Sequence, residues 1–234
     1  MFITSVRLEG IQDDTYIRRL PVVRHLAAFG ALRLTAPVTL LVGDNGAGKS
    51  TLVEAVAVAA GFDSAGGPLR DQEFRGQVSS IESSLAKWLT LRGRSIPMRG
   101  YFLRAETHYD TVTILDTLQD AESPRREMSH GESVMSVLAE QMEGAGLYIF
   151  DEPESGLSIV RQMALVAEID QAVKRGGQFI IATHSPIMMA IPDASIIEIT
   201  EKGISETVFE EAEAVLAMRE FLEDPQGTIR YILG

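Results

Sequence analysis

The chain of 234 residues contains no cysteine, one tryptophan and few aromatic side chains, which make up 6% of the sequence. The absence of cysteine excludes disulfide bonds and thiolate metal sites, and it suits a reducing cytosol. No apolar run approaches the roughly 18 residues needed to cross a bilayer, and residues 1–9 lack the basic and apolar regions of a signal peptide. We therefore expect a soluble, cytoplasmic protein without an integral membrane segment.

Positive charge is also scarce, because 21 Lys and Arg side chains stand against 33 Asp and Glu, for a net charge of −12. This balance disfavours broad electrostatic attachment to anionic membranes or nucleic acid, so direct DNA binding is not supported, although a local basic face stays open. Two groups of arginines could form such a face, and we interpret both as solvated loop and helix charges: Arg92, Arg94, Arg99 and Arg104, and Arg125 with Arg126. No heptad pattern is sustained, so a long coiled coil is not expected.

One strong motif stands against these absences, a glycine loop that fits the phosphate-binding pattern G-x-x-x-x-G-K-[ST]. Its residues are Gly43, Asp44, Asn45, Gly46, Ala47, Gly48, Lys49, Ser50 and Thr51. The apolar run 38–42 predicts a buried strand before the loop, and the run 51–60 predicts a helix after it. The glycines let backbone N–H groups turn inward around a polyphosphate at a helix N-terminus. We expect Lys49 to reach the β and γ phosphates of a nucleotide, and the Ser50 hydroxyl to hold Mg²⁺.

Two acidic residues follow a second apolar run, 147–150, as Asp151-Glu152-Pro153. Asp151, at the carboxyl end of a predicted strand, is placed to organise Mg²⁺, and Glu152 can polarise an attacking water as general base. Alternatively, the two residues only supply favourable negative charge at the start of the next helix. The presence of Lys49 upstream favours the catalytic interpretation.

His184 follows a third apolar run, at the strand edge where open α/β sheets bind ligands. A neutral imidazole there can hydrogen-bond a γ-phosphate and sense its loss. Upstream, Ser129 and Glu132 form a capping box that predicts the start of a helix. The same helix N-terminus, with Gly131, is also suited to bind phosphate.

In order and spacing these motifs resemble the ATP-binding-cassette (ABC) class of P-loop ATPases. The resemblance covers residues from about 30 to 210, with its motifs at 43–51 (Walker A), 128–132 (signature), 147–152 (Walker B and catalytic Glu), 155–158 (D-loop) and 183–186 (H-loop). The signature reads Met-Ser-His-Gly-Glu where transporters have Leu-Ser-Gly-Gly-Gln. The forms Asp-Glu-Pro-Glu-Ser-Gly-Leu-Ser and Ile-Ala-Thr-His-Ser-Pro resemble stand-alone bacterial predicted ATPases related to the Rad50/RecF/SMC branch.

The resemblance implies that ATP and Mg²⁺ are the cofactors and that two subunits form an ATP-dependent homodimer. Each ATP would lie between one Walker A loop and the partner's Ser129 signature. The residues that the resemblance assigns to catalysis are Glu152, His184 and Lys49. Glu106 stands at the Q-loop position, where transporters carry Gln, and we assign it to the metal. Tyr16 is a candidate for stacking on adenine, and a packed surface tyrosine is the alternative interpretation.

The alternation of strands and helices predicts an α/β P-loop NTPase fold, with a mostly parallel central sheet, a small antiparallel N-terminal β portion and a helical subdomain. We expect a single ABC-type ATPase domain, 1–234, comprising a nucleotide-binding core (about 1–75 and 144–210), a helical signature subdomain (about 76–143) and a C-terminal helical tail (about 210–234). The other predicted elements are strands at 1–9, 31–35, 101–105 and 178–183, helices at 79–91, 129–141 and 159–174, a hairpin of 196–199 with 205–209, and a loop with short elements over 11–30.

These inferences predict an ATPase that hydrolyses ATP to ADP and phosphate. As a soluble, dimerising ABC-type enzyme, it would drive or switch an unidentified protein partner. Two alternatives stay open: the nucleotide-binding motor subunit of an ABC membrane transporter, and a nucleotide-operated switch that hydrolyses slowly. Glu106 and the Asp-Glu-Pro-Glu-Ser-Gly stretch weigh against the transporter hypothesis.

Overall fold

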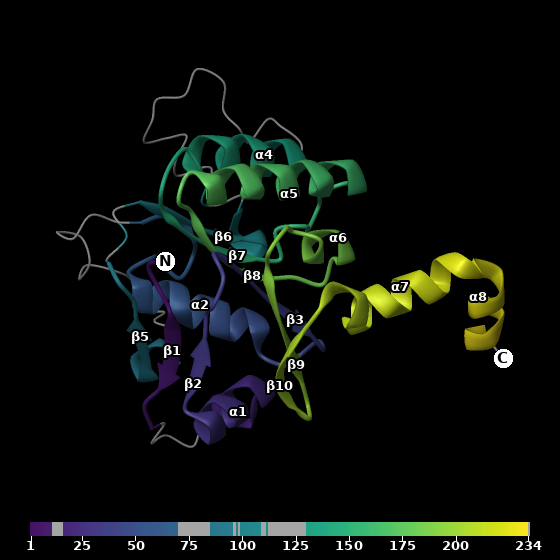
Figure 1. The fold of residues 1–234 in the computed structure, drawn as a ribbon, viewed down its shortest axis with the longest axis horizontal. Helices are drawn as coiled ribbons and strands as arrows, with labels where there is room; N and C mark the ends of the chain where they lie inside the picture. Colours follow the sequence, from purple (N-terminus) through teal and green to yellow (C-terminus); the bar gives the residue numbers. More distant parts are fainter. Residues whose placement is uncertain are drawn as a thin grey trace.

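A mostly parallel sheet forms the centre of the molecule (Figure 1). The computed structural model describes residues 1–10, 16–69, 85–95, 97, 99–108, 111 and 130–233. Within these residues the sheet has seven strands in the order β10-β9-β3-β8-β7-β6-β4, with parallel pairing from β9 to β6 and antiparallel pairing at both edges. The strands are β3 (Val38–Gly43), β4 (Gly67–Pro68), β6 (Gly100–Arg104), β7 (Leu147–Asp151), β8 (Gln178–Ala182), β9 (Ser195–Thr200) and β10 (Gly203–Thr207). The predicted α/β fold and its closing hairpin are thereby confirmed.

Helices cover both faces of this sheet. On one side lies α2 (Lys49–Ala60), and on the other lie α4 (His130–Gln141) and α5 (Ile159–Lys174), as Figure 1 shows. Successive strand residues alternate between the faces, so Leu41 packs in the cluster that includes α2, while Leu40 packs with α4 and α5. Both faces are apolar and buried, which explains why the central strands read as continuous apolar runs in the sequence.

A small antiparallel sheet, ordered β2-β1-β5, forms the predicted N-terminal β portion. Its strands are β1 (Ser5–Leu8), β2 (Ala31–Arg33) and β5 (Leu89–Arg92). The helix predicted over 79–91 is wrong in its described part, where the short 3-10 helix η3 (Ala86–Trp88) leads directly into β5. Pairing of Leu89 with β1 overrides its helical spacing from Leu85. Residues 79–84 lie outside the described residues.

The segment before β2 is more regular than the predicted loop with short elements, because residues 21–29 form a helix. The 3-10 helix η1 (Tyr16–Arg19) precedes α1 (Pro21–Phe29), which begins with its proline at the first helical position. Proline is favoured there because its fixed φ suits the helix and its missing N–H would have no intrahelical partner. Gly30, with φ 79°, ends the helix, and its N–H donates to Leu26 O at 2.9 Å.

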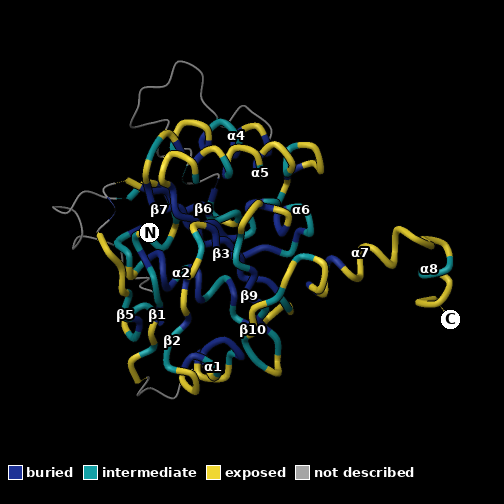
Figure 2. Tube along the Cα trace, in the orientation of Figure 1, coloured by how far each residue is buried: buried dark blue, intermediate teal, exposed yellow. Residues whose placement is uncertain are grey.

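The chain ends in two helices that project from the body (Figure 1). After α6 (Pro186–Met189) and the 3-10 helix η6 (Phe209–Glu211) come α7 (Glu213–Glu223) and α8 (Pro225–Leu233), which we call the C-terminal arm. Figure 2 shows that most of this arm is exposed. Its exposed large apolar side chains are Leu216, Met218, Phe221, Leu222, Ile229, Tyr231, Ile232 and Leu233. In the part of the chain that the structure describes, every helix is too short or too polar to cross a membrane.

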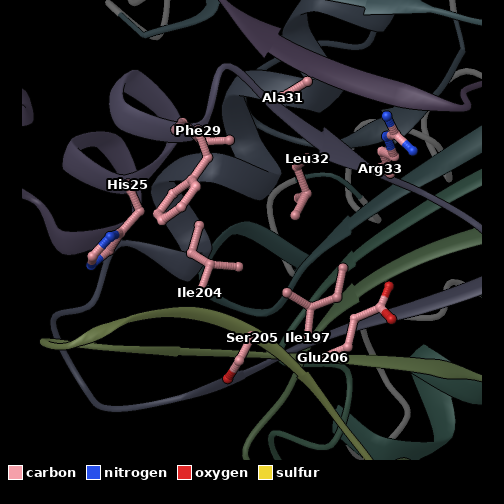
Figure 3. A pocket seen from close by; sticks show the side chains of 10 residues that line it. His25, Phe29, Ala31, Leu32, Arg33, Ile197, Ile204, Ser205 and Glu206 are labelled. Atoms are coloured by element: carbon pink, nitrogen blue, oxygen red, sulfur yellow. The ribbon is translucent and has the colours of Figure 1, made fainter.

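A cavity of about 230 Å³ lies between α1 and the strands β2, β9 and β10 (Figure 3). Phe29, Leu32, Ile197 and Ile204 gather around it. His25, at its side, has a buried Nε2 without a hydrogen-bond partner among the described residues. None of the residues predicted to bind nucleotide lines this cavity.

Candidate active site

Several of the predicted site residues lie together at one edge of the central sheet, where the parallel strands end. Across the β3–β8 pair Leu41 lies opposite Ala182, and across the β7–β8 pair Asp151 lies opposite the same Ala182. The glycine loop after β3, the acidic pair at the end of β7 and His184 after β8 are therefore neighbours in space. This is the edge at which open α/β sheets bind their ligands.

The glycine loop needs its glycines for both conformation and space. Gly43, Gly46 and Gly48 have φ of 118°, 78° and 95°, values that side chains disfavour. A Cβ on Gly43 would overlap the backbone of Ile199 in β9, and one on Gly48 would come within 2.6 Å of Val22 Cγ1 in α1. The loop is therefore clamped between β9 and α1.

The first turn of α1 supports the loop through its backbone. The Val22 N–H donates to Ala47 O at 3.1 Å, and on the opposite side the Asp44 N–H donates to Ile199 O at 3.2 Å. The sequence does not reveal this support, because Pro21 and the mixed charges of 11–30 are typical of a loop with short elements. Tyr16, the candidate for adenine, is 71% exposed in η1.

Lys49 lies over the loop that precedes it. The side chain is only 5% exposed, and its Nζ donates to Gly43 O at 2.9 Å and to Asp44 O at 2.7 Å. Burial lowers the pKa of Lys49, and the carboxylates of Glu152, Asp44, Asp151 and Glu154 oppose that shift. The ammonium group is thus held among acidic residues beside the inward-turned backbone of the loop.

Ser50 and Asp151 form a buried pair of oxygen donors. Asp151 is 6% exposed, and the Ser50 side chain hydrogen-bonds to its carboxylate. Burial is the largest cause that raises the pKa of Asp151 to about 6, with Glu152 and Glu106 adding to the rise, while the Ser50 bond and Arg104 oppose it. Asp151 Oδ1 is buried without a hydrogen-bond partner among the described residues.

These two side chains fit a magnesium ion. A hydroxyl and a carboxylate are hard oxygen ligands, and the unpartnered Oδ1 is an acceptor that a cation would satisfy. The described residues contain no group of three or more His, Cys, Asp or Glu that could hold a metal by itself. Mg²⁺ commonly takes one or two carboxylates from the protein and completes its shell with phosphate oxygens and water.

Glu152 and His184 form the exposed part of the site. Glu152 Oε1 lies 3.9 Å from His184 Nε2, and the two side chains are 44% and 38% exposed. Glu152 has φ 52°, an uncommon value for a residue with a side chain, and its N–H donates to Ala182 O at 2.9 Å. Such a conformation costs energy and persists only where the surroundings enforce it, which is typical of functional turns.

Glu154 has no role predicted from the sequence, although the structure gives it several contacts in the site. One oxygen, Oε1, accepts hydrogen bonds from Thr183 Oγ1 at 2.7 Å, His184 N at 2.7 Å and Ser185 N at 3.2 Å. The residue lies two positions after Glu152, in the same turn. Its only signal in the sequence is its place in the Asp-Glu-Pro-Glu stretch.

The start of α4 packs on the D-loop and α5. A Cβ at Gly131 would lie 2.7 Å from Arg161 Nη1 and 3.1 Å from Gly156 O. The neighbouring Glu132 forms an ion pair with Arg161 at 3.1 Å. These contacts are on the sheet face opposite α2, so Gly131 is packed away from the helix that follows its own glycine loop. Ser129 lies outside the described residues.

Glu106 lies at the border of the site, in the 3-10 helix η4 (Ala105–Thr107). It is 79% exposed, and its Oε2 pairs with Arg104 Nη2 at 3.3 Å. Arg104 Nη1 also bonds Glu54 Oε2 at 2.8 Å and Ser64 O at 3.3 Å. The charge of Glu106 still contributes to the raised pKa of Asp151.

The C-terminal arm is anchored next to the glycine loop. A cavity of about 290 Å³ is lined by Asp44 and His184 from the site and by Ala214 and Ala217 from α7. The Glu213 N–H at the start of α7 donates to Glu198 Oε1 at 3.2 Å. The first turns of α7 therefore form one wall beside the site.

Family models and curated relatives match this part of the chain. A model described as "AAA domain, putative AbiEii toxin, Type IV TA system" matches residues 103–190, and a model described as "AAA domain" matches residues 28–136. The cytochrome c biogenesis ATP-binding export protein CcmA of Zymomonas mobilis subsp. mobilis is 31% identical over 170 aligned residues, covering 64% of this chain and 67% of the relative. CcmA of Gluconobacter oxydans is 30% identical over 153 residues, covering 63% of this chain and 68% of the relative.

Solved structures resemble the fold. One, described as "An inward-facing conformation of a putative metal-chelate type ABC transporter", has a TM-score of 0.50 at 16% identity and covers 90% of this chain and 84% of its own. The SMC head domain from Thermotoga maritima has a TM-score of 0.48 at 12% identity, over 89% of this chain and 99% of its own. The geometry at the strand ends and the similarity to the CcmA proteins both indicate an ATP-binding site. The chain therefore belongs to the ABC/AAA-type P-loop ATPases and is an enzyme that hydrolyses ATP.

Proposed function

We propose that the chain binds Mg-ATP at the end of the sheet and cleaves it between two subunits, in order to drive or switch a macromolecular partner. The observation that carries this proposal is the meeting of Lys49, Asp151, Glu152 and His184 at one sheet edge, from three different strand ends. Phosphoryl transfer to water requires a phosphate cradle, charge neutralisation and an oriented water molecule. These residues offer a group for each requirement.

In the proposed mechanism the loop from Gly43 to Thr51 binds the phosphates of ATP. Its backbone N–H groups and the N-terminus of α2 face the negative charge, and Lys49 exchanges the carbonyls of Gly43 and Asp44 for phosphate oxygens. Ser50 and Asp151 hold Mg²⁺, which, when bound, neutralises charge that develops on the phosphate oxygens.

Glu152 acts as the general base in this scheme. Glu152 follows Asp151, the last residue of β7, and its carboxylate is partly exposed. A water molecule can therefore reach it from the open side of the site. Glu152 takes a proton from that water as the oxygen attacks the γ-phosphorus, and the bond from phosphorus to the bridging oxygen of ADP breaks. His184, 3.9 Å from Glu152, hydrogen-bonds the γ-phosphate and so distinguishes ATP from ADP.

A second copy of the chain completes the site in this proposal. Gly131, at the start of α4, packs on the D-loop and α5 on the sheet face opposite α2, which favours contact of the signature with another subunit. The helix N-terminus supplied by the partner, including Ser129, would bind the γ-phosphate across the interface. Two subunits with a net charge of −12 each repel one another, and contacts of both faces with Mg-ATP would offset this repulsion and favour the dimer.

Size-exclusion chromatography tests the dimer on Glu152→Gln, which should bind ATP and hydrolyse it slowly. We expect this variant to elute as a dimer with Mg-ATP and as a monomer with Mg-ADP. Lys49→Ala, which should not bind nucleotide, serves as the control and should stay monomeric in both. A Glu152→Gln protein that binds Mg-ATP and remains monomeric at high concentration would refute the shared site.

The organisation of the chain belongs to the same proposal. We assign 1–75 and 144–210 to the nucleotide-binding core and 210–234 to a C-terminal tail, within one domain. The predicted helical signature subdomain, 76–143, needs correction, because β5 and β6 within it pair in the two sheets and belong to the core, whereas α4 remains assigned to that subdomain. Glu106 is proposed as a peripheral contributor to the metal site, through its charge beside Asp151. Because the reaction consumes ATP, we place the enzyme in the cytoplasm, where ATP is abundant.

A second candidate function is that of a motor subunit in an ABC membrane transporter. It is favoured by the similarity to CcmA proteins, whose name describes an ATP-binding export protein. Affinity purification from detergent-solubilised membranes of the native host separates the two candidates. A stoichiometric membrane protein would support the transporter, whereas recovery only from the soluble fraction would support the stand-alone enzyme.

A further inference from the structure

The carboxylate of Glu154 connects two loops that carry the reacting groups. Its Oε1 accepts hydrogen bonds from three consecutive residues after β8: Thr183 Oγ1 at 2.7 Å, His184 N at 2.7 Å and Ser185 N at 3.2 Å. A hydrogen bond to an ionised acceptor is shorter and stronger than one between neutral groups. A single anionic oxygen therefore fixes the backbone from which the His184 side chain extends.

Glu154 and Glu152 belong to the same tight turn. The Ser155 N–H donates to Glu152 O at 3.0 Å, and the Leu157 N–H donates to Glu154 O at 2.9 Å. Glu152 thus faces the His184 imidazole at 3.9 Å, while Glu154 holds the His184 backbone from the same turn.

A purely structural role as a helix cap does not account for these contacts. The helix α6 has its own cap, because Ser185 Oγ accepts from Ile187 N at 3.1 Å and from Met188 N at 3.4 Å. Moreover, Glu154 Oε2 is buried and lacks a hydrogen-bond partner in the described part of the chain. A buried acceptor oxygen without a partner is costly, and a neutral side chain would cap a turn at lower cost.

We propose that Glu154 is a positioning residue for hydrolysis, which holds His184 at the distance from Glu152 that the γ-phosphate requires. The inference rests on the proposed function, in which Glu152 is the base and His184 contacts the γ-phosphate. Glu154 does not touch the nucleotide in this scheme, and its effect on kcat is exerted through His184. Its charge also opposes the lowered pKa of Lys49, an effect on phosphate binding that KM reports separately.

A double-variant cycle tests this role, with kcat and KM for Mg-ATP measured on wild type, Glu154→Ala, His184→Ala and the double variant. We expect Glu154→Ala to lower kcat by about 10- to 100-fold, because small displacements of positioned groups have effects of this size. KM should stay within about threefold, since the glycine loop is unchanged. In the His184→Ala background the same substitution should cause no further loss of kcat.

Two further variants serve as controls. Glu154→Gln keeps an acceptor oxygen and should retain more activity than Glu154→Ala, and it replaces Glu154→Ala in the cycle if that variant does not fold. Glu201→Ala removes an exposed acid whose only described ion pair is with Arg24, and it should behave as wild type. Thermal melting of each variant separates loss of catalysis from loss of folded protein.

The outcomes distinguish this inference from the proposed function. Equal losses from Glu154→Ala in the wild-type and His184→Ala backgrounds would overturn the inference, as would a wild-type kcat for Glu154→Ala. In both cases a defective His184→Ala enzyme would leave the proposed function intact. Wild-type turnover by His184→Ala would instead remove the role of His184, and the inference with it.

Discussion

Asp151 and Glu152 are adjacent in the chain, yet their carboxylates lie in opposite surroundings. Asp151 is buried, bonded to Ser50 and close to Lys49, and we call these three residues the closed half of the site. Glu152 and His184 are each more than one third exposed, and they form the open half. The difference separates two tasks: burial suits the binding of phosphate and metal, whereas access suits the entry of water and of a partner.

Removing Lys49 should break the closed half and have the largest effect. Lys49→Ala lacks the cation that neutralises the phosphates, so we expect ATP binding and hydrolysis to be lost. A fluorescent ATP analogue titrated against the variant measures this loss. Lys174→Ala is the matched control, because Lys174 is 62% exposed and pairs only locally with Asp170, four residues before it. Nucleotide binding by Lys49→Ala at wild-type affinity would contradict the assignment of the loop.

Removing the base should break the open half while leaving the closed half intact. For Glu152→Gln we expect kcat to fall by about 10²- to 10⁴-fold, since the amide cannot accept the proton of the attacking water. ATP affinity should be retained, because Lys49, Ser50 and Asp151 are unchanged. Phosphate release and equilibrium ATP binding are measured on the same preparation. Turnover at the wild-type rate would move the base elsewhere in the site.

Neutralising the buried carboxylate should stabilise the protein in the absence of ligands. The pKa of Asp151 rises from 3.8 to about 6 on folding, so its contribution to stability is full below pH 3.8 and is lost as the pH rises through 6. Near pH 8 we therefore expect Asp151→Asn to have a free energy of unfolding up to about 3 kcal/mol above wild type. Urea denaturation at pH 4 and pH 8 checks the value.

The control for this prediction is Asp170→Asn, in a pair that lies on the surface of α5. It should change stability by less than about 1 kcal/mol at either pH. If Asp151→Asn were no more stable than wild type at pH 8, the buried charge would have a partner that offsets its burial. Burying the charge of Asp151 would then cost less free energy than its raised pKa indicates.

Glu106 should show the smallest effect, because it is 79% exposed and already paired with Arg104. Glu106→Gln removes a charge that raises the pKa of Asp151, so the pKa of Asp151 should fall slightly. We expect the Mg²⁺ dependence of turnover to change by less than about threefold, as is usual for an exposed charge. A tenfold or larger increase in the Mg²⁺ requirement would place Glu106 in direct contact with the metal.

The sequence signals for the closed half are local. A strand buried on both faces reads as a continuous apolar run, and the loop motif specifies its glycines and its lysine within nine positions, 43–51. The apolar runs before Asp151, Glu152 and His184 likewise predict that these residues follow strands. The sequence does not say which strands are neighbours; the register across Ala182 shows that β3, β8 and β7 are adjacent.

The sequence-based predictions were wrong or incomplete where the structure depends on partners distant in the chain, or on the place of a residue within a helix. Leu85, Trp88 and Leu89 fit a helical spacing, but β1 offers Leu89 a strand partner. Pro21 indicated a loop, although at the first position of a helix it favours the helix. Glu154 gave no sign of its contacts, because its three donors come from residues about 30 positions later in the chain.

Because α7 is anchored beside the glycine loop, a small rotation at its first turn would produce a larger displacement at its far end. The anchor is at Glu213, whose N–H donates to Glu198 at the wall of the site. The 11 residues of α7 extend about 16 Å from that point. A rotation of α7 by about 10° about Glu213 would therefore displace the far end of the helix by about 3 Å. A spectroscopic probe near Glu223 would magnify a change at the site that is too small to follow at the loop itself.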